Sequence, residues 1–148
     1  MHEEFNFRIE KIDGIIEIIS NSGGNSCNSS LYLSYENALW LINKLRPMTF
    51  EELTNNLTFN KEKIKYKPLN NRISLDFAFV DRGNCWITVT SLWNEDYFPF
   101  GSMTLPFSII EQFEDKFYFK EFVYPFLDEL EKYLPDEYKA KVIHQKGE

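Results

Sequence analysis

Apolar and polar residues alternate at the start of the chain. Phe5, Phe7 and Ile9 are separated by polar residues, and a run of isoleucines follows the dipeptide Asp13-Gly14. A period of two is typical of a half-buried strand, and Asp-Gly favours a tight turn with positive φ at both central residues. The pattern predicts a β-hairpin over residues 5–19, followed at residues 20–30 by a flexible polar loop of Ser, Asn, Gly and one Cys.

Helical spacing begins after Ser34, a favourable N-cap residue. The apolar residues that follow this spacing are Tyr35, Ala38, Leu39, Leu41, Ile42 and Leu45. Arg46-Pro47 ends the helix, because a proline disfavours helical backbone at the residue before it. Thr49 and Glu52 then have the spacing of a capping box, which predicts one or two further turns over residues 50–57.

The middle of the chain reads as a sheet. Residues 64–67 alternate lysine with Ile64 and Tyr66, a pattern typical of an edge strand. Residues 73–80 alternate in the same way, and residues 85–93 are rich in β-branched and aromatic side chains. We expect these two segments to form the centre of the sheet, joined by a turn at residues 81–84. Residues 94–102 are predicted to form a loop.

The C-terminal third is predicted to be helical. Pro106, Ser108 and Glu111 resemble a helix start with a second capping box, and apolar residues then mostly keep helical spacing as far as Leu134. Pro125 must kink or divide this segment, and we expect the division near residues 115–118. Residues 137–148 are predicted to form a short helix or strand, with a frayed tail at residues 144–148.

These elements predict one α+β domain over residues 1–148, with a mostly antiparallel sheet and helices packed on one face. A chain of 148 residues is long enough for one core. It lacks any apolar run of roughly 20 residues, so no membrane span is predicted. The acidic start Met1-His2-Glu3-Glu4 lacks the features of an export signal, and a cytoplasmic location is expected. Cys27 and Cys85 are expected to be unpaired structural thiols.

The residues that commonly carry catalysis or bind metals are scarce. The chain has two histidines, His2 and His144, and both lie in terminal segments. A histidine base, a Ser-His triad or a histidine-ligated zinc would therefore depend on a terminus, and we predict no enzyme, cofactor or metal. The alternative is a histidine-independent enzyme that uses carboxylates from the set Asp76, Asp81, Glu95 and Asp96.

The net charge of −7 is unevenly distributed and argues against nucleic-acid binding. Residues 61–72 carry five cations and one carboxylate, but an acidic remainder would repel phosphates. Residues 111–137 carry nine carboxylates and three lysines. An acidic stripe steers a basic protein partner when aromatic residues lie close enough to anchor it. The protein-binding residues predicted on this basis are Glu121, Tyr124, Asp128 and Glu131 in the helix, with Trp93, Glu95, Asp96, Tyr97 and Phe98 in or beside the 94–102 loop.

A small, acidic, aromatic-rich and histidine-poor α+β domain resembles the immunity proteins of bacterial polymorphic toxins, including those of contact-dependent growth inhibition systems. Residues 134–139, Leu-Pro-Asp-Glu-Tyr-Lys, also resemble a signature of the SUKH immunity superfamily. In that superfamily the signature precedes a glycine-rich turn and a sheet, whereas here it lies near the C-terminal end, so the SUKH fold is not carried over.

The resemblance implies a protein-binding inhibitor that covers the active site or substrate groove of a cognate toxin domain, often a basic one. We expect the chain itself to be a monomer or a weak dimer. A phage-encoded antagonist of a host defence protein would rely on the same surface, and the carboxylate enzyme remains the alternative from another class.

Overall fold

The computed structural model describes residues 5–22, 29–56, 63–66, 71–81, 84–93, 101–110 and 116–147. Two antiparallel sheets and four helices make up this part of the chain. The α+β class and the antiparallel pairing predicted from the sequence are confirmed.

The first sheet has the order β1-β2-β3. Its strands are β1 (Phe5–Ile12), β2 (Ile15–Ser22) and β3 (Ser29–Ser34). Asp13 and Gly14 both have positive φ, 50° and 80°, so the predicted primed turn is confirmed. β3 was not predicted: residues 29 and 30 were assigned to the polar loop, and both pair with β2. Residues 20–22 of the predicted loop belong to β2, and residues 23–28 lie outside the described residues.

The second sheet has the order β4-β5-β6-β7-β8. Its strands are β4 (Lys63–Tyr66), β5 (Asn71–Asp81), β6 (Asn84–Trp93), β7 (Gly101–Ile110) and β8 (Lys116–Tyr118). The predicted edge strand and the central pair β5-β6 are confirmed. Alternate residues of β5, β6 and β7 are buried, which places one face of the sheet against the core. Residues 94–100 of the predicted loop lie outside the described residues, and its last two residues, Gly101 and Ser102, belong to β7.

Two helices follow β3. Helix α1 (Tyr35–Leu45) begins where the Ser34 Oγ accepts a hydrogen bond from the Asn37 N–H at 3.1 Å, a cap that contributes about 1 kcal/mol. Helix α2 (Phe50–Asn56) begins with a reciprocal capping box, in which Thr49 and Glu52 bond each other's backbone N–H. Both predicted helix starts are confirmed.

The predicted helix start at Pro106 is wrong. Residues 101–110 form β7, and Pro106 pairs with Trp86 of β6. β8 pairs with β7 only at residues 108–110, so Pro106 lies where β7 has one strand partner within its sheet. A proline is tolerated at such a position because its missing N–H leaves no ladder bond unmade.

The helical part of the C-terminal third is shorter than predicted. Helix α3 (Val123–Glu131) contains Pro125 in its first turn, where the missing N–H has no helical acceptor to lose. The proline therefore marks a helix start and not a kink. Helix α4 (Asp136–Lys139) follows Pro135, and residues 140–147 return across α1.

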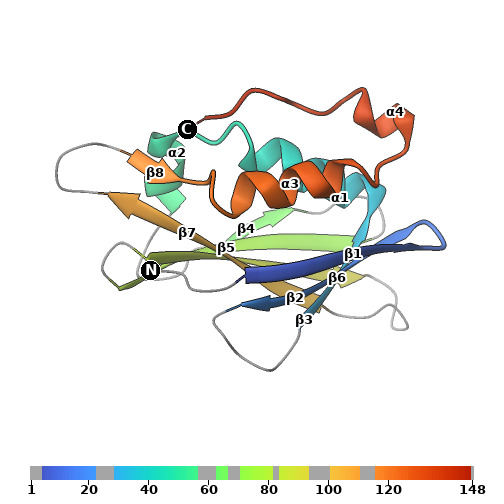
Figure 1. Cartoon of the computed structure of the whole chain (residues 1–148), viewed down its shortest axis with the longest axis horizontal. Helices are drawn as coiled ribbons and strands as arrows, with labels where there is room; N and C mark the ends of the chain where they lie inside the picture. Colours follow the sequence, from blue (N-terminus) through green and yellow to red (C-terminus); the bar gives the residue numbers. More distant parts are fainter. Residues whose placement is uncertain are drawn as a thin grey trace.

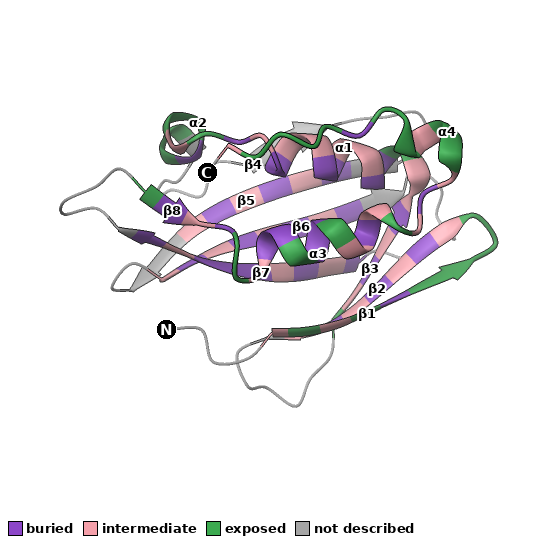
Figure 2. Ribbon diagram, turned by 45° about the horizontal axis from the view of Figure 1, so that its top comes forward, coloured by how far each residue is buried: buried purple, intermediate pink, exposed green. Residues whose placement is uncertain are grey.

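The helices lie on one side of the two sheets (Figure 1), as predicted. In Figure 2, buried segments in purple recur along β5, β6 and β7 and along α1 and α3. Aromatic rings join the layers: Phe7 of β1 contacts Phe126 of α3 edge-to-face, with ring centroids 5.2 Å apart. The rings of Phe107 and Phe119 meet at the same distance. Such pairs favour the packing beyond the apolar area that they bury.

The returning C-terminal segment is fastened to α1. The Asn43 side chain donates to the Lys141 carbonyl at 3.1 Å and accepts from the Ile143 N–H at 2.8 Å. The Gly147 N–H donates to the Arg46 carbonyl at 3.0 Å. Gly147, which lies in the tail predicted to be frayed, is therefore hydrogen-bonded to the residue that follows α1.

Candidate functional site

The predicted acidic stripe on the C-terminal helix is mostly occupied by contacts within the molecule. Asp128 and Glu131 lie 2.8 and 2.9 Å from the Arg46 guanidinium, whose side chain is 2% exposed. Tyr124 is buried, and the Lys146 ammonium lies 5.1 Å from the centre of its ring. The expectation that all four side chains face water is therefore wrong for Tyr124, whereas Asp128 is 55% exposed and Glu131 is 22% exposed. Their role in protein binding stays a prediction. Glu121 is exposed, in the turn before α3.

The second half of the predicted interface lies mostly outside the described residues. Trp93 ends β6, but the placement of its side chain is not described, and Glu95, Asp96, Tyr97 and Phe98 lie outside the described residues. Their role in binding stays a prediction.

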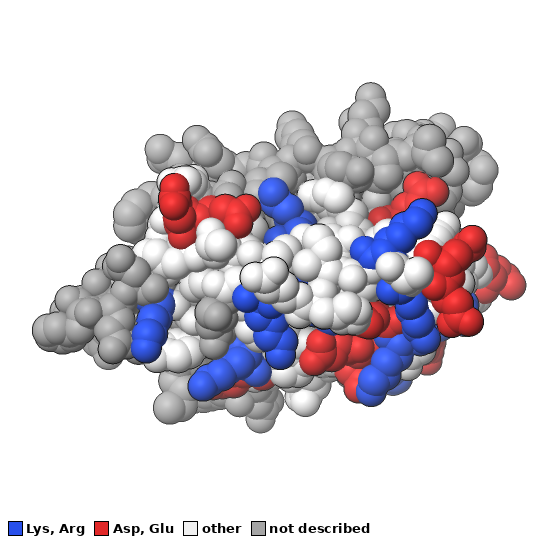
Figure 3. All heavy atoms as spheres, turned by 90° about the horizontal axis from the view of Figure 1, so that it is seen from above, with Lys and Arg blue, Asp and Glu red and all other residues white. Residues whose placement is uncertain are grey.

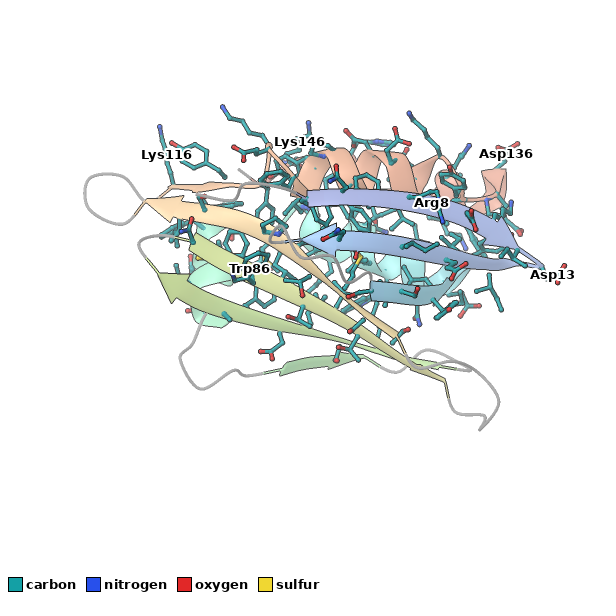
Figure 4. The ribbon with its side chains drawn as sticks, turned by 60° about the horizontal axis from the view of Figure 1, so that its bottom comes forward. Arg8, Asp13, Trp86, Lys116, Asp136 and Lys146 are labelled. Carbon is teal, nitrogen blue, oxygen red and sulfur yellow. The ribbon has the colours of Figure 1, made fainter. Side chains whose placement is uncertain are left out.

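Asp76, one of the four carboxylates proposed for the alternative enzyme, lies on the second sheet. Asp76 is in the middle of β5, half-buried on the face opposite Leu75 and Phe77, and its register partner on β6 is Thr88. Trp86 of β6, labelled in Figure 4, lies on the same face, because its register partner on β5 is Ala78. Asp76 Oδ1 has no hydrogen-bond partner in the described structure. Within the described ranges, no group of three or more His, Cys, Asp and Glu side chains could hold a metal ion.

An open groove of about 460 Å³ lies between α1 and the α4 segment, which comprises α4 and the residues that follow it as far as Lys141. It is lined by Glu36, Leu39, Trp40, Asn43, Glu137, Tyr138 and Lys141. The four residues from α1 recur at spacings of three and four, so they form one stripe along that helix. The stripe lies beside the buried one, which is made of Asn37, Ala38, Leu41, Ile42 and Leu45.

The two walls of the groove are held together by packing and by hydrogen bonds. The rings of Tyr35 and Tyr138 meet edge-to-face, with centroids 5.6 Å apart. Asn43 binds the backbone of residues 141 and 143, which continues from α4. Since both contacts join α1 to the α4 segment, the groove has a defined width when the partner is absent, and little ordering entropy has to be lost on binding.

The groove combines an apolar floor with charged margins. Leu39, Trp40 and Tyr138 are half-buried, while Glu36 and Glu137 are exposed. Figure 3 views the helical side of the molecule and shows acidic side chains gathered toward the α4 end, with lysines among them. Aromatic side chains beside carboxylates suit a basic partner, because the rings exclude water from the ion pairs and attract cations themselves.

The environment of the groove affects the pKa of Tyr138. Burial raises the pKa of its phenol above the usual value of 10.0, and the nearby carboxylates of Glu36 and Glu137 raise it further, as does Tyr35 to a smaller degree. Both causes disfavour a phenolate, since burial removes water from a charged oxygen and the carboxylates repel it. The phenol therefore stays a neutral hydrogen-bond donor at physiological pH.

Sequence reasoning missed this groove, although the chain carries a signal for it. Leu39 was assigned to the buried helix face, and Trp40 was not used. Tyr35, Leu39 and Trp40 add apolar residues beyond the stripe that packs on the sheet. A second apolar stripe on a helix indicates a second contact surface. What covers part of it, α4, could not be inferred from the helical pattern of α1 alone.

None of the helices in the described ranges is both long and apolar enough to cross a membrane. Comparison with protein-family models, with curated proteins and with solved structures finds no match to this chain.

Proposed function

We propose that this chain is a protein-binding inhibitor of the immunity-protein type, and that its α1–α4 groove holds a basic segment of the partner. The observation that supports this is the groove itself, which is lined by Leu39, Trp40 and Tyr138 together with Glu36 and Glu137. This surface combines aromatic side chains with negative charge, a combination that the sequence predicts instead for the C-terminal helix and the 94–102 loop.

The charge of the protein favours a basic occupant. The net charge of −7 attracts a basic protein over a distance set by the ionic strength, and Glu36 and Glu137 would pair with its Lys or Arg side chains. Trp40 and Tyr138 can take the aliphatic part of such a side chain, or its cation, against their rings. Lys141 at the same margin would select an occupant that also carries an acceptor for its ammonium group.

The proposed inhibition results from steric covering of the partner's active site. A rigid groove that binds a segment beside the partner's active site prevents substrate from reaching it, and this needs no chemistry from the inhibitor. The Asp76 carboxylate lies on the sheet face opposite the core and is not required for this role.

The test begins with capture of the tagged protein from its native host and identification of stoichiometric partners by mass spectrometry. The purified partner is then titrated with the wild type and with Glu36→Lys/Glu137→Lys. The matched control, Glu17→Lys/Glu51→Lys, makes the same change in net charge at residues outside the groove. We expect the groove variant to lose about 30-fold or more in affinity, which corresponds to roughly 2 kcal/mol, while the control stays within a few-fold.

Trp40→Ala should weaken the same complex by a similar factor if the indole is an anchor. Circular dichroism confirms that each variant remains folded. Equal losses in the groove variant and the charge-matched control would contradict the groove assignment. A partner that binds but whose toxicity or activity is unaffected by the wild-type protein would contradict the inhibitor role while leaving the groove as a binding site.

A further inference from the structure

β1 is the outer strand of the first sheet. It pairs with β2 along all eight of its residues, and no described strand pairs with its other side. Arg8 and Glu10 on this strand are exposed, at 66% and 46%, and form an ion pair at 3.3 Å. Figure 4 shows Arg8 along β1, with Asp13 at the tip of the hairpin. An edge strand of this length presents a row of backbone groups that can bind another strand.

The hairpin turn determines which backbone groups face outward. In a two-residue hairpin the residues that flank the turn, here Ile12 and Ile15, exchange backbone hydrogen bonds. Bonding then alternates along β1, so the even-numbered residues bond to β2. The N–H and C=O groups of Phe7, Ile9 and Lys11 therefore point toward the free edge.

This alternation restricts how a second copy of β1 could pair with the first in an antiparallel arrangement. Hydrogen bonds form only when odd-numbered residues oppose odd-numbered residues. With Ile9 opposite Ile9 of the second copy, Arg8 of the first copy faces Glu10 of the second. By symmetry, Glu10 of the first copy faces Arg8 of the second. In the two neighbouring registers that also oppose odd-numbered residues, Arg8 lies opposite Arg8 or Glu10 lies opposite Glu10. The attraction between unlike charges therefore favours the register centred on Ile9.

We propose that β1 is a dimerisation edge, which binds a second copy of this chain antiparallel about Ile9 and joins two three-stranded sheets into one of six strands. The facing Arg8 and Glu10 side chains occupy non-hydrogen-bonded positions, where opposed side chains come closest. Because pairing of one strand buries less area than a standard stable interface, the dimer is weak and salt-sensitive.

A charge-exchange series tests the register. Sedimentation velocity of the wild type, up to roughly 0.1 mM protein, should show a reversible dimer. Arg8→Glu and Glu10→Arg each place like charges opposite one another twice, and each should raise the dimer dissociation constant by about tenfold or more. Arg8→Glu/Glu10→Arg restores unlike pairs and should return the constant to near the wild-type value. Arg8 and Glu10 lie on the exposed face of β1 in both copies. Circular dichroism should therefore find every variant folded.

Cross-linking tests the same geometry independently. Under mild oxidation Arg8→Cys/Glu10→Cys should form a covalent dimer in which mass spectrometry finds position 8 linked to position 10. Arg8→Cys alone should not form an 8-to-8 link, because those positions are not opposed. A wild type that sediments as a monomer at every concentration overturns the proposal. So does a dimer that is indifferent to the single reversals, or one that the double exchange does not restore.

Discussion

Arg46 joins three parts of the chain that lie far apart in sequence. Its guanidinium pairs with Asp128 and Glu131 of α3 and donates to the Ile143 carbonyl at 3.1 Å. Its own carbonyl accepts from the Gly147 N–H. A guanidinium that is removed from water needs such partners, because an unpaired buried charge is costly. This one residue therefore orients α3 and the C-terminal segment against α1.

Replacing Arg46 should destabilise the protein strongly. Arg46→Ala removes both ion pairs and leaves Glu131, 22% exposed, without its partner. We expect a loss of about 2–4 kcal/mol in the free energy of unfolding, measured by urea denaturation. Lys132→Ala is the control, since its ion pair with Glu129 is exposed on both sides and should contribute little. Equal losses for the two variants would show that the buried network does not stabilise the fold.

Tyr138 should make the protein sensitive to alkaline pH. Because its pKa is higher in the folded state than in the unfolded chain, the folded state holds the phenol proton longer. The associated stability is present below about pH 10 and is lost as pH rises through the folded-state pKa. An ultraviolet titration of tyrosinate, compared with that of Tyr138→Phe, should place the Tyr138 midpoint above the usual value.

Glu36→Gln should lower that midpoint but leave it raised, because burial is the larger cause of the shift. Glu17→Gln, outside the groove, serves as its control. A Tyr138 midpoint at or below the ordinary tyrosine pKa would contradict the burial of this ring in the groove.

At the scale of elements, sequence rules predict a helix or strand correctly where the residues that determine it lie close together in the sequence. The β1-β2 hairpin follows from alternation and Asp13-Gly14, and α1 follows from the Ser34 cap and apolar spacing. The same local rules are wrong for β7. Residues 106–111 match a helix start, but β6 supplies a strand partner for residues 101–108. Pairing along a whole strand outweighs the local preference for a helix, which is worth only tenths of a kcal/mol per residue.

At the scale of the whole molecule, the two sheets meet where β7 approaches β3. Gly101 begins β7 and lies against the backbone of Ser30 and Leu31. A Cβ at position 101 would overlap the Ser30 carbonyl oxygen and lie 3.1 Å from Leu31 Cα. Since these are backbone atoms of a paired strand, they cannot move aside without disturbing the sheet. The glycine therefore permits the close approach of the sheets.

Gly101→Ala should accordingly destabilise the protein by about 1–3 kcal/mol, the usual range for an overpacked interior. Ser102→Ala is the matched control, because the adjacent side chain is half-buried on the opposite face and should cost less than about 0.5 kcal/mol. Thermal melts of the two variants check the difference. An unchanged melting temperature for Gly101→Ala would mean that β3 and β7 are not in close contact.

By itself the sequence determined the α+β class, the hairpin with its primed turn, the caps of α1 and α2 and the central strand pair. Each depends on the chemistry of residues that lie within a few positions of one another. Only the tertiary structure decided that residues 101–110 form a strand, that Asp128 and Glu131 bind Arg46, and that α4 completes a groove with α1. These features depend on contacts between residues about 80 to 100 positions apart, or on strand partners and packing that local spacing does not encode.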